Sequence, residues 1–277
     1  MRLGRRSTNV EDRRGRGGLI AGGGIGALVI VLLAVFMGVD PAEVLPPQGQ
    51  SAQTPYSEPG GPITDEGGIF VEQVLADTED TWRELFPQQF GREYQEPRLV
   101  LFSGAVQSAC GMGQAAMGPF YCPPDQQVYI DLQFYRELRD RFGAPGDMAQ
   151  AYVIAHEVGH HIQTLLGISQ QVHQQRQRLS RGEGNELSVM QELQADCFAG
   201  VWANHAQRRD VLEAGDLEEA LTAAAAIGDD RMQRETQGRV SPESWTHGSS
   251  AQRVRWLRRG FDSGDARQCD TFAASRL

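Results

Sequence analysis

Residues 151–163 read AYVIAHEVGHHIQ and hold three of the chain's six histidines beside one glutamate in an otherwise apolar run. The apolar residues predict a helix buried inside a domain. On such a helix His156 and His160 stand at positions i and i+4, about 40° apart on one face, so both imidazoles can face one metal ion. His161 points about 140° away from His156 and lies outside this predicted metal site.

A second segment offers carboxylates for the same ion. Residues 187–202 read LSVMQELQADCFAGVW, in which Glu192 and Asp196 are also at i and i+4. Catalytic zinc usually has three protein ligands and a water, so a carboxylate from this helix would complete the site. The other carboxylate would accept a hydrogen bond from a ligand histidine and fix its ring. Glu186 and His173 are the alternatives for the third ligand.

Glu157 follows the first candidate ligand directly and is the candidate general base. Zinc acidifies its bound water and polarises a carbonyl, while the glutamate takes the proton and passes it to the leaving amine. The pattern therefore predicts a zinc endopeptidase acting on a peptide or protein substrate, and there is no G-x-S-x-G or comparable nucleophile signature. The alternative is a zinc-binding structural or interaction module without turnover.

The charges are unevenly distributed. The chain has 36 acidic and 26 basic residues, all of the latter arginines, and a net charge of −10. Residues 1–18 hold six arginines against two acids, a net +4, which leaves −14 on the remainder. An acidic body argues against nucleic acid as a partner, because phosphate binding needs a basic surface.

Residues 19–39 read LIAGGGIGALVIVLLAVFMGV and carry no charge. At about 1.5 Å per residue they would span a hydrocarbon core of about 30 Å, so a transmembrane helix is predicted. The preceding arginines would place the N-terminus in the cytoplasm. A cleaved signal peptide is the alternative, although no A-x-A-like site follows.

These features predict four parts: a basic cytoplasmic leader (1–18), a transmembrane signal-anchor helix (19–39), a Pro/Gly-rich tether (40–66) and a zinc metallopeptidase domain (67–277). The tether holds six of the 13 prolines and has almost no periodic apolar pattern. We expect a single-pass protein of the cytoplasmic membrane with its N-terminus inside and its domain on the extracytoplasmic side. Cleavage in the tether would instead release a soluble secreted peptidase.

The fold predicted from the patterns is α+β, a small sheet followed by helices. Residues 97–104 and 127–135 are rich in Val, Tyr, Ile and Phe and predict strands, the second a candidate edge for pairing with an extended peptide. Ala195 and Ala199 would let their helix approach the histidine helix closely. Helices are predicted from residue 67 to about 86, and over 147–166, 187–206, 216–227 and 250–261.

Four cysteines follow the predicted span, where disulfides can persist: Cys110, Cys122, Cys197 and Cys269. The short separation of the first two suits a local disulfide and would leave Cys197 to pair with Cys269. Four cysteines allow three pairings, and the sequence does not choose among them. Free buried cysteines are the alternative.

Five segments resemble, in order and spacing, the bacterial neutral zinc metallopeptidase family, a group of single-span, membrane-anchored proteins. They are PFYCPPDQQVYIDLQFY (119–135), AYVIAHEVGHHIQ (151–163), ELQADCFAGVWA (192–203), AIGDDR (226–231) and THGSSAQRVRWLRRGFDSGD (246–265). The resemblance covers roughly residues 66–272, and H-E-x-x-H followed by E-x-x-x-D is the gluzincin arrangement. It implies a zincin-like fold, one Zn²⁺ per chain, Glu192 as third ligand and Asp196 as the carboxylate behind a ligand histidine.

The last of these segments contains His247, a candidate donor to the oxyanion of a tetrahedral intermediate. The alternative is a structural turn that caps the following helix. In that alternative the arginines of the helix form a solvated face: Arg253, Arg255, Arg258 and Arg259. Residues 228–231 would bind a second ion such as Ca²⁺, or form a turn at the end of a helix.

Overall fold

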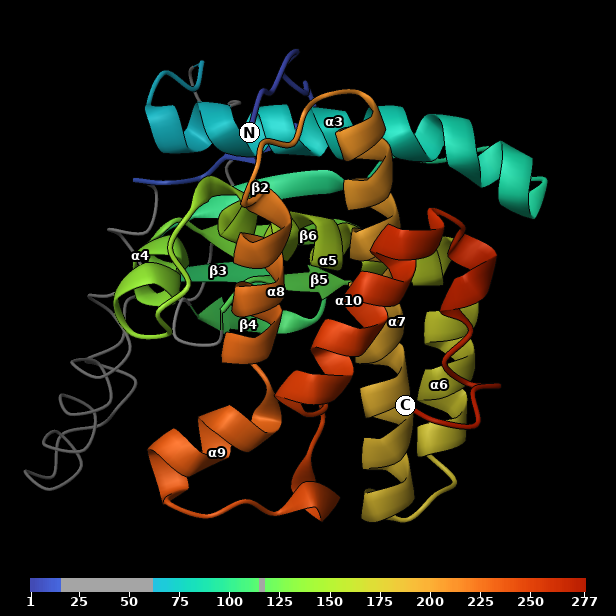
Figure 1. Cartoon of the computed structure of the whole chain (residues 1–277). Coiled ribbons are helices and arrows are strands. Elements are labelled where there is room, and N and C mark those ends of the chain that lie inside the picture. Colours follow the sequence, from blue (N-terminus) through green and yellow to red (C-terminus); the bar gives the residue numbers. More distant parts are fainter. Residues whose placement is uncertain (16–61, 115–117) are drawn as a thin grey trace, which may run out of the picture.

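The computed structural model describes residues 1–15, 62–114 and 118–277. In Figure 1, α3 crosses above the sheet and the long helices of the C-terminal half stand beside it. The elements in chain order are β1 (Val10–Asp12), α3 (Glu66–Phe90), β2 (Arg98–Phe102), β3 (Ala105–Ser108), β4 (Gly111–Gln114), β5 (Phe120–Cys122), β6 (Gln127–Asp131), α4 (Gln133–Asp140), α5 (Asp147–Leu165), α6 (Ile168–Arg176), α7 (Arg181–Arg208), α8 (Asp216–Ala226), α9 (Asp229–Gln237) and α10 (Ser250–Ser263).

The main sheet has the strand order β1-β2-β6-β5, and β3 and β4 form a separate hairpin. β1, β2 and β6 run parallel, whereas β5 runs antiparallel to β6 at the edge. Four of the five residues in β2 and in β6 are buried, as expected for parallel strands covered on both faces. The prediction of an α+β fold is therefore wrong. The fold is mixed α/β, and α3 lies in the chain between the parallel strands β1 and β2.

The predicted strand over 127–135 is two elements rather than one. Its first part is β6, which lies inside the sheet, and the chain turns into α4 after Asp131. Asp131 accepts hydrogen bonds from the backbone N–H groups of Gln133 and Gly104. A short polar side chain that binds the backbone two residues on favours a turn, and this ends the strand. The edge predicted here is instead β5.

Residues 1–15, the described part of the leader predicted over 1–18, contribute to the fold. β1 pairs with β2, and the ammonium group of Met1 lies 2.7 Å from a carboxylate oxygen of Asp147, the first residue of α5. Arg5 binds the carboxylates of Glu79 and Asp80 on α3. The arginines thus neutralise an acidic helix of the same domain. A topology with this segment and the domain on opposite sides of a membrane is wrong, because both belong to one folded unit.

The predicted transmembrane helix needs a correction as well. No helix in the described part of the chain is both long enough and apolar enough to cross a membrane. The predicted span (19–39) and nearly all of the tether lie outside the described residues. The structure therefore gives no support to the predicted single-pass membrane protein.

Two disulfides join Cys110 to Cys122 and Cys197 to Cys269. The first ties the turn of the β3–β4 hairpin to the edge strand β5. The second ties α7 to a short helical turn, Ala266–Cys269, near the C-terminus. These are the two pairs that the short separation of Cys110 and Cys122 suited, although the sequence left all three pairings open.

Candidate metal centre

The ligand atoms of three predicted metal ligands converge. His156 Nε2 lies 3.1 Å from one carboxylate oxygen of Glu192, and His160 Nε2 lies 3.3 Å from the other. One ligand atom from each residue falls within 4.8 Å of the others, so the three could hold a metal ion. His156 and His160 come from one face of α5, and Glu192 comes from α7.

Close contact between α5 and α7 makes this convergence possible. A Cβ atom on Gly159 would lie 2.8 Å from the carbonyl oxygen of Ala195 and 3.2 Å from its side chain. Real side chains do not approach that closely, so only glycine allows this crossing. Ala195 thus packs closely against α5 as predicted, and the residue that it meets there is Gly159, which lies inside the histidine motif.

Each of the two candidate ligand histidines has a partner for its other ring nitrogen. His156 Nδ1 lies 2.8 Å from a carboxylate oxygen of Asp196, and His160 Nδ1 lies 2.9 Å from the side-chain oxygen of Gln163. An acceptor at Nδ1 keeps the proton there and leaves the Nε2 lone pair for a metal. Gln163 was not predicted, although its place three residues after His160 on the same helix is a usable signal.

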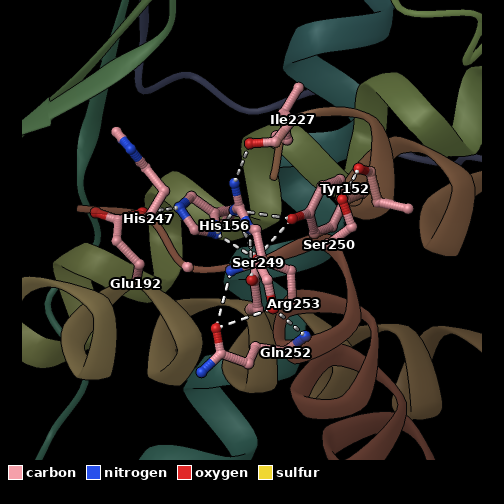
Figure 2. Close-up of polar contacts among 12 residues, drawn as sticks. Tyr152, His156, Glu192, Ile227, His247, Ser249, Ser250, Gln252 and Arg253 are labelled. Atoms are coloured by element: carbon pink, nitrogen blue, oxygen red, sulfur yellow. Dashed lines mark hydrogen bonds and ion pairs between the residues drawn. The ribbon is translucent and has the colours of Figure 1, made fainter. Parts of the chain in front are cut away.

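Asp196 is fully buried and is held by α10. Arg253 Nε and Nη2 lie 2.8 and 2.9 Å from its two carboxylate oxygens, and the Tyr152 hydroxyl donates to it at 2.5 Å. Figure 2 shows Arg253 bonded also to Tyr152 and to the Ile227 carbonyl. Burial alone would raise the pKa of Asp196, but Arg253 and His156 lower it to about 2.

The alternative of a solvated arginine face on α10 is wrong for Arg253, whose side chain is 2% exposed. The other three arginines of that group are exposed: Arg255, Arg258 and Arg259. α10 packs against α7 through Gly260, where a Cβ atom would collide with the Cys197 carbonyl. This contact turns Arg253 toward Asp196. Gly260, seven positions after Arg253 and so on the same face of the helix, was the sequence signal that this face packs closely against another helix.

Glu157 lines the same cleft as the three candidate ligands, a cavity of about 550 Å³. Its side chain is buried, and burial raises the pKa of its carboxyl above the usual value. It makes no hydrogen bond to another residue of the described chain. A buried carboxylate without a protein partner is available to water or substrate in the cleft.

His247 lies across this cleft, with its side chain 53% exposed. One carboxylate oxygen of Asp229 accepts hydrogen bonds from the backbone N–H groups of Thr246, His247 and Gly248, at 2.6 to 3.0 Å. The other lies 3.4 Å from His247 Nδ1. Burial alone would lower the pKa of His247, but the carboxylates of Glu192 and Asp229 raise it above the usual value. Sequence reasoning did not identify this role of Asp229.

The remaining candidates lie elsewhere. Glu186 and His173, the alternatives for the third ligand, are exposed, and neither lines the cleft. Asp229 and Asp230 begin α9, and Asp230 accepts hydrogen bonds from the Ser250 backbone and hydroxyl. Both acids thus hold the loop before α10, whose N-cap is Ser249. They do not form a metal-binding group in the part of the chain that the structure describes.

A family model described as "Putative neutral zinc metallopeptidase" matches residues 1–272. The chain is 52% identical over 282 residues to "Uncharacterized protein YpfJ" of Escherichia coli (strain K12), with 98% of each chain covered. It is 40% identical over 264 residues to "Uncharacterized protein Rv2575" of Mycobacterium tuberculosis (strain H37Rv), covering 88% of this chain and 86% of the relative. No solved structure matches. The chain belongs to this zinc metallopeptidase family.

Proposed function

We propose that this protein is a zinc-dependent endopeptidase with His156, His160 and Glu192 as zinc ligands. The observation that carries the proposal is the convergence of two Nε2 atoms and one carboxylate beside Glu157, which makes no hydrogen bond to another described residue. Membership in a family described as zinc metallopeptidases supports a peptide or protein as substrate.

The donor set fits zinc. Two imidazole nitrogens and one carboxylate are the ligands of many catalytic zinc sites, and such sites leave one position for water. Ligand atoms about 2.0–2.2 Å from a tetrahedral ion lie about 3.3 Å apart. His156 Nε2 lies 3.1 Å from one oxygen of Glu192 and His160 Nε2 lies 3.3 Å from the other, and one ligand atom from each of the three residues falls within 4.8 Å of the others.

The bound zinc would acidify a water and polarise the scissile carbonyl. Glu157 would take a proton from that water at its carboxylate and deliver it to the leaving amine. His247 would donate an N–H to the developing oxyanion, oriented by Asp229. Asp196 would hold the His156 ring through Nδ1, with its own position maintained by the buried Arg253.

The cleft suits an extended peptide. β5 has a neighbour on one side only in the described sheet, and its residues Phe120 and Tyr121 line the cleft beside the ligands. A free strand edge binds peptides through main-chain hydrogen bonds. Apolar side chains line another part of the cleft, which would accept an apolar residue of the substrate: Phe134, Phe142, Val153, Ile227 and Met232.

The test compares wild type with Glu157→Gln for zinc content and for cleavage of a diverse peptide library. We expect one zinc per chain in both proteins, and a loss of cleavage by about 10²–10⁴-fold in the variant, because a positioned general base contributes about that much. Glu186→Gln, an exposed acid of α7, is the control and should cleave like wild type. A wild type that holds one zinc and cleaves nothing would instead indicate the binding module without turnover.

A further inference from the structure

His161, the third histidine of the motif, makes two hydrogen bonds in a fully buried position. Its Nε2 lies 2.6 Å from the Gln95 carbonyl oxygen, and its Nδ1 lies 3.0 Å from the Tyr121 hydroxyl. A carbonyl only accepts, so the proton of the neutral ring is on Nε2, and Nδ1 accepts from Tyr121. Burial lowers the pKa of His161 to about 4, in keeping with a neutral ring.

The partner Tyr121 belongs to β5, whose side chains are anchored on both faces. Phe120 stacks on Tyr129 of β6 with ring centroids 4.7 Å apart. Tyr121 points the other way and meets His161 of α5 edge to face, at 5.6 Å. The edge strand is therefore attached to α5 through the Tyr121 hydroxyl.

α5 thus carries two features on different faces. His156 and His160 face the metal site, whereas His161 faces β5. Because a helix is rigid over two turns, a strand bound at His161 has a fixed distance to the ligands one residue and five residues earlier. The residues of β5 that line the cleft are held by this contact.

We propose that His161 is a positioning residue that holds the peptide-binding edge of β5 against α5 through the Tyr121 hydroxyl. A peptide paired with β5 then lies with its scissile bond over Glu157 and the ligands. This inference rests on the proposed peptidase function. It assigns to the third histidine a role in substrate alignment, separate from metal binding.

Three variants test the two hydrogen bonds separately. Tyr121→Phe removes the hydroxyl and keeps the ring. His161→Gln places an amide near the Nε2 position and keeps the bond to Gln95, whereas His161→Asn places its oxygen near Nδ1 and keeps the acceptor for Tyr121. For an extended peptide we expect Tyr121→Phe and His161→Gln to raise KM about tenfold with kcat within about twofold. The KM of His161→Asn should remain within about threefold of the wild-type value, and all three variants should keep one zinc per chain.

Tyr94→Phe is the matched control. The Tyr94 ring also packs edge to face on His161, at 6.0 Å, but its buried hydroxyl makes no hydrogen bond in the described chain. Removal of this hydroxyl leaves no acceptor unpaired, so KM and kcat should not change. An equal effect of Tyr94→Phe and Tyr121→Phe would mean that only packing around His161 matters, and would overturn the inference.

Hydrogen exchange of the amides in residues 118–126 gives a readout that needs no activity. We expect faster exchange in Tyr121→Phe than in wild type, and wild-type exchange in Tyr94→Phe, with α5 unchanged in both. Unchanged exchange and KM in Tyr121→Phe, or loss of zinc together with the KM effect, would overturn the inference. A wild type that cleaves nothing would defeat the proposed peptidase function, and the exchange data would still decide whether His161 holds β5.

Discussion

At the residue scale, Arg253 supports the candidate metal site without being a candidate ligand itself. Its guanidinium forms a bidentate pair with Asp196, and both side chains are almost fully buried. A buried carboxylate without a partner is strongly disfavoured, so the cation keeps Asp196 ionised behind His156. The orientation of the His156 ring, a candidate metal ligand on α5, therefore depends on a side chain from α10.

His247 carries a prediction at the same scale. In the metal-free protein the carboxylates of Glu192 and Asp229 raise its pKa above the usual 6.5. Asp229 lies 3.4 Å from His247 Nδ1 and is not a candidate ligand, so it still favours the imidazolium when Glu192 binds zinc. If the cation donates to the oxyanion, activity is present below this raised pKa and is lost as pH rises through it. We expect an alkaline limb above pH 6.5 in kcat/KM. His247→Gln should lower kcat/KM by roughly 10²-fold and lose that limb.

His173→Gln is the control for this measurement. His173 is exposed on α6 and lies outside the cleft, so its variant should keep both the rate and the pH profile of wild type. The role of His247 is refuted if His247→Gln retains the wild-type alkaline limb at full rate.

At the scale of elements, the crossing of α5 and α7 sets the distance between histidines and carboxylate. Gly159→Ala would bring a methyl group to 2.8 Å from the Ala195 carbonyl oxygen. The helices must move apart, which separates Glu192 from both Nε2 atoms. We expect a loss of about 1–3 kcal/mol in the free energy of unfolding from overpacking, together with weaker zinc binding. Chemical denaturation and a zinc titration measure the two effects.

Gly182→Ala serves as the matched control, because a Cβ atom there meets nothing within 4 Å. Gly182 lies in the first turn of α7, where alanine has the higher helix propensity, so the variant should be neutral or more stable by up to about 1 kcal/mol. Equal zinc affinity in Gly159→Ala and wild type would contradict the argument from helix approach.

At the scale of the whole molecule, the two disulfides close loops of very different length, with sequence separations of 12 and 72 residues. In the chain-entropy model a longer loop gives the larger stabilisation, by about 1.5 kcal/mol for this pair. Replacement of Cys197 and Cys269 by alanine should therefore lower the free energy of unfolding more than replacement of Cys110 and Cys122. Urea denaturation of the oxidised proteins measures both. Equal or reversed losses would contradict this account.

The N-terminal segment also belongs to the whole molecule. β1 extends the sheet beside β2, and the family match begins at residue 1, well before the region that the sequence motifs cover. Its arginines pair with acids of α3, among them Glu72 and Glu79. From the sequence, the separate basic segment predicted a membrane topology; in the structure its arginines instead pair with acids of the same domain.

The sequence by itself determined the features that depend on local spacing. The i, i+4 positions of His156 and His160 follow from helix periodicity, and the same holds for Glu192 and Asp196 on the next helix. Most helices and the strand β2 follow from apolar patterns for the same reason. The candidate site was accordingly predictable, because its ligands come from two regular helices.

Only the tertiary structure decided which residues meet across elements. Arg253 and its exposed neighbours are all arginines on one helix, and only packing through Gly260 buries the first of them. The edge position of β5, the entry of β1 into the sheet and the bond from Tyr121 to His161 likewise join segments far apart in the chain. Such contacts depend on the path of the backbone between elements, which local periodicity does not specify.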